Sequence, residues 1–174
     1  LQDGDSDGVI RRAMNAFPFT DVVKATLARY FLPNGRAPGK PYLRAPMPST
    51  HDNHVHNGLS MLGSFVEVFL AKEGHNGKVG VNLLTKLQLP NLSALYGAML
   101  AGVDNVLMGA GIPREVPGAL DRLAQHAAAT FRLDITQNPA LGTDPEPLVF
   151  SPADFGAHGM APLRRPDFYP IVSS

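Results

Sequence analysis

Apolar residues follow two patterns along the chain, one typical of a buried strand and one typical of a helix, and residues 79–123 show both clearly. Residues 79–84 form a short apolar run, which predicts a strand covered on both faces. Residues 91–100 follow with apolar side chains at helical spacing. The same two patterns return at 103–108 and 116–126. A strand, a crossover helix and a second parallel strand form the repeating unit of an α/β sheet.

The flanking patterns predict further elements around this unit. Residues 21–32 have an apolar side typical of a helix, with Thr20 as a candidate N-cap. Residues 65–71 are rich in aromatic and β-branched side chains, which favours a strand. Further strands are expected at 42–47, entering a proline-punctuated loop, at 131–135, as a small edge strand, and at 168–173, as a buried strand.

Five of these strands, at 42–47, 65–71, 79–84, 103–108 and 168–173, decide the expected fold. They fit a small open doubly wound sheet, or the first part of a (β/α)8 barrel, which typically needs about 250 residues. A final strand with no helix after it favours the barrel. We therefore expect an α/β fold: the N-terminal part of a (β/α)8 TIM barrel with a leading helix, in a chain that ends before the barrel closes. Residues 1–12 are expected to be loose, 13–174 to form the barrel portion, and 137–167 to be an irregular insertion.

Composition narrows the functional classes. The formal net charge of zero provides no basic field for a nucleic-acid backbone or an anionic membrane. The absence of cysteine excludes disulfides and thiolate zinc sites. No apolar run is long enough to span a bilayer, and no N-terminal signal peptide is recognisable, so we expect a cytoplasmic protein without a nucleic-acid or membrane partner.

One dense group of potential metal ligands occurs at His51, Asp52, His54 and His56. Their spacing matches no helical pair of zinc ligands, and no second cluster completes a defined ligand set, so a polar loop or helix start is favoured over a metal site. A metal-dependent hydrolase using these histidines stays open as a third hypothesis. Glu67 stands within an apolar run; if it is buried, it must be paired or have a shifted pKa, and a paired structural role is favoured.

The central motif, GVNLLTKLQLP followed by LYGAMLAGVDNVLMGAGIPREVPGALDRLA, resembles the nitronate monooxygenase (2-nitropropane dioxygenase-like) family of FMN-dependent TIM barrels. The resemblance extends back through FVEVFLAKEGHNG and AFPFTDVVKATLARYFLPNGRAPGKPYLRAPMPS, and forward to PLRRPDFYPIVSS. It implies an oxidoreductase that binds FMN across the C-terminal ends of the strands. The implied reaction is the oxidation of alkyl nitronates by molecular oxygen, or that of a related flavin reductase.

The resemblance also implies the cofactor-binding residues. Ala45, Pro46 and Met47 correspond to the first-strand segment whose backbone lines the isoalloxazine, and Asn82 to the side chain that hydrogen-bonds the flavin ring. Gly109, Ala110 and Gly111 form the mouth of the following strand, where glycines permit close approach. An amide offers both a donor and an acceptor to a heterocycle, although an Asn at a strand end is more often a turn former and G-A-G more often a tight connection. Lys86 provides positive charge near the flavin or is solvated.

The catalytic residue stays unknown at this point. In the family, the phosphate loops and the catalytic histidine come from later strands in a G-G-H type segment, and this chain contains no such segment. We therefore expect this chain to be inactive alone, with a small-molecule nitronate and oxygen as substrates of the completed barrel. The expected partner is the remaining barrel half or another copy in a homo-oligomer. The alternative function is a non-catalytic half-barrel that pairs with a complementary or identical chain.

Overall fold

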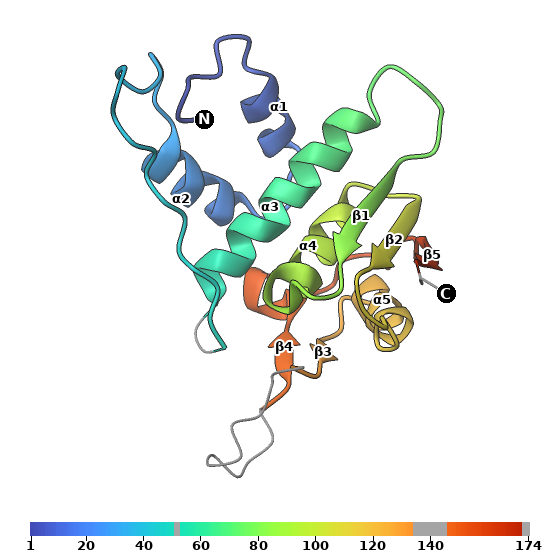
Figure 1. The fold of residues 1–174 in the computed structure, drawn as a ribbon. Coiled ribbons are helices and arrows are strands. Elements are labelled where there is room, and N and C mark those ends of the chain that lie inside the picture. The colour runs from blue at the N-terminus through green and yellow to red at the C-terminus, as the bar shows by residue number, and fades with distance from the viewer. Residues whose placement is uncertain (51–52, 134–145, 172–174) are drawn as a thin grey trace, which may run out of the picture.

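The computed structural model describes residues 1–50, 53–133 and 146–171. Helices dominate the first half, and a small parallel sheet organises the second (Figure 1). The elements, in chain order, are α1 (Val9–Asn15), α2 (Thr20–Tyr30), α3 (His54–Ala71), β1 (Gly80–Leu84), α4 (Gln88–Leu100), β2 (Asn105–Gly109), α5 (Val116–Ala124), β3 (Ala129–Phe131), β4 (Leu148–Phe150), the 3-10 helix η1 (Pro152–Phe155) and β5 (Asp167–Pro170).

The predicted strand–helix–strand–helix unit is confirmed as β1, α4, β2 and α5. The main sheet has the order β1-β2-β5, and both pairings are parallel. Gly102 has a φ of 75° just after α4, the left-handed conformation that ends a helix and that glycine adopts without steric cost. The class is therefore α/β, with a parallel sheet whose strands follow one another in chain order.

The predicted strand at 65–71 is wrong, because these residues form the last turns of α3. Met61, Phe65 and Phe69 recur every four residues and face the core or its edge, which is helical and not strand periodicity. The β-branched and aromatic composition that suggested a strand is overridden by packing along an 18-residue helix. Glu67 is exposed on α3, so its predicted burial and pairing are wrong as well.

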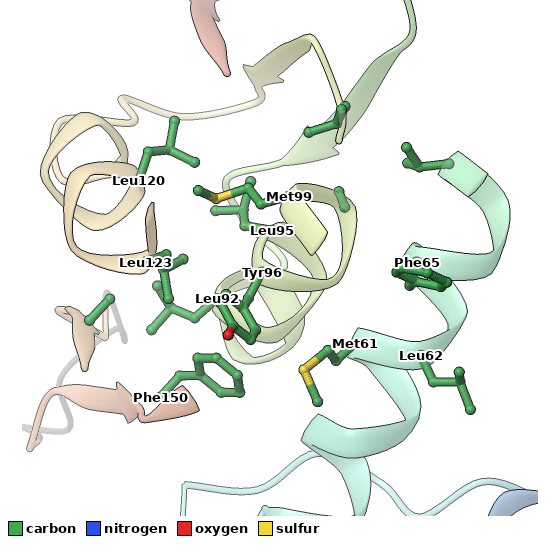
Figure 2. Packing of buried hydrophobic residues seen from close by; sticks show 14 of the residues in the cluster. Met61, Leu62, Phe65, Leu92, Leu95, Tyr96, Met99, Leu120, Leu123 and Phe150 are labelled. Carbon is green, nitrogen blue, oxygen red and sulfur yellow. The ribbon is translucent and has the colours of Figure 1, made fainter. Parts of the chain in front are cut away.

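Helix α4 lies at the centre of the molecule and packs against α3 (Figure 2). Tyr96 and Leu95 of α4 are fully buried, and Met61 of α3 is buried beside them. Gly97 permits this close crossing, because a β carbon at that position would overlap the backbone carbonyl of Met61. Helices α1 and α2 pack on α3, on the side away from the sheet (Figure 1).

Several other predicted elements are absent or have different boundaries in the structure. Residues 42–47 form no strand, because their backbone is irregular and the segment is largely exposed. Thr20 is the first residue of α2 and makes no capping hydrogen bond there. Only Phe131 of the predicted strand 131–135 lies in β3, which pairs antiparallel with β4, and residues 134–135 lie outside the described residues. The expected irregular region 137–167 contains β4, η1 and the first residue of β5, while residues 137–145 of it are not described.

The two faces of the main sheet differ in burial. Val81, Leu83, Val106, Met108 and Phe168 point into the core. The alternate positions form the opposite face, where Asn82 is exposed, Leu84 is 48% exposed and Tyr169 is 50% exposed. The predictions of a doubly covered first strand and of a buried last strand are therefore wrong for the residues described.

Candidate functional site

The carboxyl edge of the parallel sheet is the candidate site, because ligands of open α/β sheets and of barrels bind where the parallel strands end. The register pairs Asn82 of β1 with Leu107 of β2, and Leu107 with Tyr169 of β5. Side chains of paired residues in adjacent strands point to the same face, so these three form one row across the open face. Asn82 therefore lies in the middle of β1, and its partner Leu107 lies two residues before Gly109, the end of β2.

Two turns meet at this edge and hold each other in place. The Thr85 N–H after β1 donates to the Gly109 carbonyl of β2 at 2.8 Å. The buried amide of Asn91 donates to the Leu84 carbonyl at 3.0 Å, which ties the start of α4 to the end of β1. Side-chain and backbone hydrogen bonds thus fix the β1–α4 turn against β2.

The Gly109–Ala110–Gly111 turn has an unusual backbone. Ala110 has a φ of 57°, in the left-handed region that costs a residue with a β carbon about 1–2 kcal/mol. Gly111 has a φ of 153°, and a β carbon there would lie 3.0 Å from the Thr85 β carbon. Backbone strain of this kind clusters at functional sites, so this turn is included in the candidate site.

Apolar side chains that remain in solvent surround the two turns. Leu87, Ile112 and Ile171 are 59%, 69% and 47% exposed, and Leu84 joins them at the end of β1. The buried hydroxyl of Thr85 has no hydrogen-bond partner among the described residues. The edge therefore combines exposed apolar side chains with one buried hydroxyl that lacks a partner among the described residues.

Ala45, Pro46 and Met47 do not join this edge. Met47 is 85% exposed, and the Pro46 carbonyl lies 3.3 Å from Nδ1 of His56 at the start of α3. Figure 1 shows the segment running beside α2 towards the N-terminal end of α3. The structure thus places Asn82 two residues before the β1 position that pairs with Gly109, and it leaves the 45–47 segment apart from this edge.

The amino edge of the sheet carries a different kind of cluster, which sequence reasoning missed. Asp104, just before β2, is 6% exposed and accepts hydrogen bonds from Lys72 Nζ at 2.7 Å, Arg164 at 2.8 Å and the Val79 N–H at 2.9 Å. The Lys72 hydrogen bond and the Val79 N–H hold the pKa of the Asp104 carboxyl well below its usual range. Through these contacts within the chain, the Asp104 carboxylate joins α3, the sheet and the 156–166 segment. Its role is therefore structural.

A second buried polar pair joins α4 to the end of α5. The Tyr96 hydroxyl lies 2.6 Å from Nδ1 of His126, and Nε2 of His126 lies 2.9 Å from the Ala161 carbonyl. The carbonyl can only accept, so Nε2 carries the proton and Nδ1 accepts from the tyrosine. Burial raises the pKa of the Tyr96 phenol far above its ordinary value. This pair is likewise occupied by internal contacts.

The two described histidines of the 51–56 segment make separate contacts. His54 stacks on Phe155, with ring centroids 4.4 Å apart, whereas His56 contacts the Pro46 carbonyl and the Ser60 hydroxyl. His51 and Asp52 lie outside the described residues. Within residues 1–50, 53–133 and 146–171, no three His, Cys, Asp or Glu side chains gather as metal ligands.

Comparison of the chain with family models, curated proteins and solved structures gives no match. Across the described part of the chain, no helix has the length and apolar character needed to cross a membrane. The sheet, its carboxyl edge and the sequence motif that builds both are therefore the features that indicate a function.

Proposed function

We propose that this chain contributes consecutive strands to a flavin-binding (β/α)8 barrel of the nitronate monooxygenase type, which oxidises alkyl nitronates with molecular oxygen. The observation that carries the proposal is the β1-β2-β5 sheet, which is parallel, follows chain order, and leaves one face open. The strained glycine turn lies at the carboxyl end of its middle strand.

The open face supports a barrel because parallel sheets in known folds have both faces covered. In a barrel the inner face is filled by side chains from the other strands, and the outer face carries the helices. A strand order that continues in one direction matches the winding of a barrel, whereas a doubly wound sheet reverses its order at a switch point. The row of Asn82, Leu107 and Tyr169 would then face the barrel interior.

The residues at the carboxyl edge fit a flavin in part. Asn82 offers an amide donor and acceptor on the open face, and the exposed Gly111 carries no side chain that would block a flat ring, whereas Gly109 is buried against Ile171. Ala45, Pro46 and Met47 make no such contribution in this arrangement. FMN, when bound, would supply the redox chemistry by taking electrons from the substrate and passing them to oxygen. The protein residues named here would bind and orient it.

The loops at residues 85–87 and 110–115 contain no histidine, so this edge provides no imidazole as a catalytic base. The same open face favours the second candidate function, a non-catalytic half-barrel that pairs with a complementary or identical chain. Both candidates require that other strands cover the face. Flavin binding separates them, because only the first requires a cofactor at the carboxyl edge.

The test is the visible spectrum and native mass of the natural protein, followed by two matched variants. We expect flavin absorbance, and we expect Asn82→Ala to weaken FMN binding while the far-ultraviolet circular dichroism stays unchanged. Asn105→Ala is the control, since Asn105 lies on the same face at the amino end of β2. A protein that takes up no FMN even when reconstituted would refute the flavin proposal. A flavin-free dimer or hetero-complex would instead support the half-barrel.

A further inference from the structure

A groove lies between α2, the first turns of α3 and η1, and none of the described residues of the main sheet lines it. Its volume of about 890 Å³ is within the usual range of small-molecule sites, roughly 300–1,000 Å³. The buried residues that line it include Phe19, Thr26 and Tyr30, which are 6%, 7% and 8% exposed. The groove therefore offers a ligand two aromatic rings and a hydroxyl group.

Three elements converge at Gly58 of α3, which is part of the wall of this groove. A β carbon at Gly58 would lie 3.3 Å from the Val22 side chain of α2 and 3.4 Å from the Phe155 ring of η1. The groove is thus formed by the packing of segments that are distant in sequence, and not by the exposed side of a single helix.

The hydroxyl of Thr26 forms no hydrogen bond with another described residue, although Thr26 is only 7% exposed. A buried hydroxyl without a partner costs folding free energy unless water or a ligand supplies the missing bond. Because Thr26 lines the groove, a polar group of a ligand there can provide that bond.

A second cavity, of about 370 Å³, adjoins the groove and is lined by residues of the α3 start, β4 and η1. The two cavities share His54, Asp154 and Phe155 as lining residues. The His54 ring stacks on the Phe155 ring, with centroids 4.4 Å apart and planes inclined by 5°. This stacked pair therefore forms part of the wall of both cavities, and a single ligand can extend from one cavity into the other.

The smaller cavity is negatively charged. Glu146 and Asp154 line it, and neither carboxylate forms an ion pair or a side-chain hydrogen bond with another described residue. Of the described residues, no lysine or arginine lines this cavity. In the larger groove, the formal charges of Asp21 and Arg29 balance each other. A ligand that complements both cavities therefore has an apolar body and a cationic end.

We propose that the groove and the adjoining cavity bind an arylalkylammonium ion. Its ring lies in the groove against Phe19 and Tyr30, because aromatic rings pack favourably on one another. Its ammonium group lies in the smaller cavity, near Asp154 and Glu146. This site is separate from the carboxyl edge of the main sheet, so the proposal does not depend on flavin binding.

The test uses tryptamine as the probe, tryptophol as its neutral counterpart and indole-3-propanoate as its anionic counterpart. We expect tryptamine to bind the natural protein about threefold or more tightly than tryptophol, and indole-3-propanoate to bind most weakly. Calorimetry measures the three affinities. Chemical shifts of the backbone amides should change on tryptamine binding within residues 19–30, 54–59 and 148–156.

Substitutions separate the charged end of the ligand from its apolar body. Asp154→Asn and Glu146→Gln should each weaken tryptamine binding about threefold, and together about tenfold, while tryptophol binding stays unchanged. Glu67→Gln is the matched control, because Glu67 is exposed on α3 and lines neither cavity. Ala25→Phe, at an exposed position of α2 that lines the groove, should weaken the binding of both compounds by about tenfold or more.

The proposal is overturned if none of the three compounds binds, or if the shift changes lie outside the two cavities. It is equally overturned if tryptophol binds as tightly as tryptamine, or if the double variant keeps the natural affinity for tryptamine. Tightest binding of indole-3-propanoate would assign charge recognition to Arg29 and would also overturn it. None of these results bears on the flavin proposal, because the residues 109–111 and Asn82 line neither cavity.

Discussion

Gly97 of α4 lies directly against the backbone carbonyl of Met61 in α3, and this contact sets the distance between the two central helices. Figure 2 shows the Met61 and Tyr96 side chains packing beside the crossing. A β carbon at position 97 would overlap backbone atoms, which cannot rotate away as a side chain can. The close packing of α4 on α3 therefore requires that residue 97 has no side chain.

Gly97→Ala should destabilise the protein by about 3 kcal/mol, because α3 and α4 must move apart to accept the methyl group. Gly63→Ala is the matched control, since Gly63 lies in α3 with no atom near its virtual β carbon. That substitution should be neutral or stabilising by up to about 1 kcal/mol, as expected for glycine in a helix. Urea unfolding of both variants measures the difference. Equal free energies of unfolding would show that the helices cross less closely than described.

Asp104→Asn should cost about 2 kcal/mol, because Lys72 and Arg164 lose the carboxylate that joins them. The pKa of Asp104 is depressed in the folded state, so its contribution is fully present above the ordinary aspartate value, near pH 4, and is lost as the pH falls through the lower folded value. Unfolding free energies measured from pH 7 down to pH 2 should therefore fall less steeply in the variant. If the unfolding free energy of the variant and of the natural protein fell equally with pH, the stabilising role of the Asp104 carboxylate would be refuted.

Tyr96→Phe should cost about 1–2 kcal/mol, because His126 loses a buried hydrogen bond. The pKa of Tyr96 is raised in the folded state, so its contribution to stability is complete below about pH 10, the ordinary tyrosine value, and declines as the pH rises further. In an alkaline absorbance titration, Tyr96 should ionise only when the protein unfolds. The variant should lose this late component, whereas Tyr169→Phe, at an exposed position, should retain it.

Glu67→Ala should change the free energy of unfolding by no more than about 0.5 kcal/mol, because Glu67 is exposed on α3. Phe65→Ala, two residues away on the buried side of the same helix, should cost about 3–5 kcal/mol. Thermal or urea unfolding of the pair tests the helical assignment directly. Comparable losses would indicate that both side chains are buried, as the original strand interpretation required.

The sequence by itself determined the α/β class and the elements from β1 to α5. In that region, strand and helix periodicities are distinct, and Gly102 marks the end of α4. It also indicated that β1 and β2 end at the same edge, because adjacent parallel strands run in the same direction, and the structure pairs Leu84 with Gly109 there. The 65–71 segment misled because β-branched and aromatic residues suit a strand and also suit a buried helix face, and only its contact with α4 selects the helix.

Tertiary structure alone decided which face of the sheet is open and which charges are paired. Asp104, Lys72 and Arg164 are distant in sequence, so no local pattern reveals that they meet. The overlap between Gly97 and Met61 likewise depends on how two helices cross. Local periodicity determines which face of an element is apolar. Which element packs against that face, and which groups pair with each charged side chain, depend on contacts between distant segments.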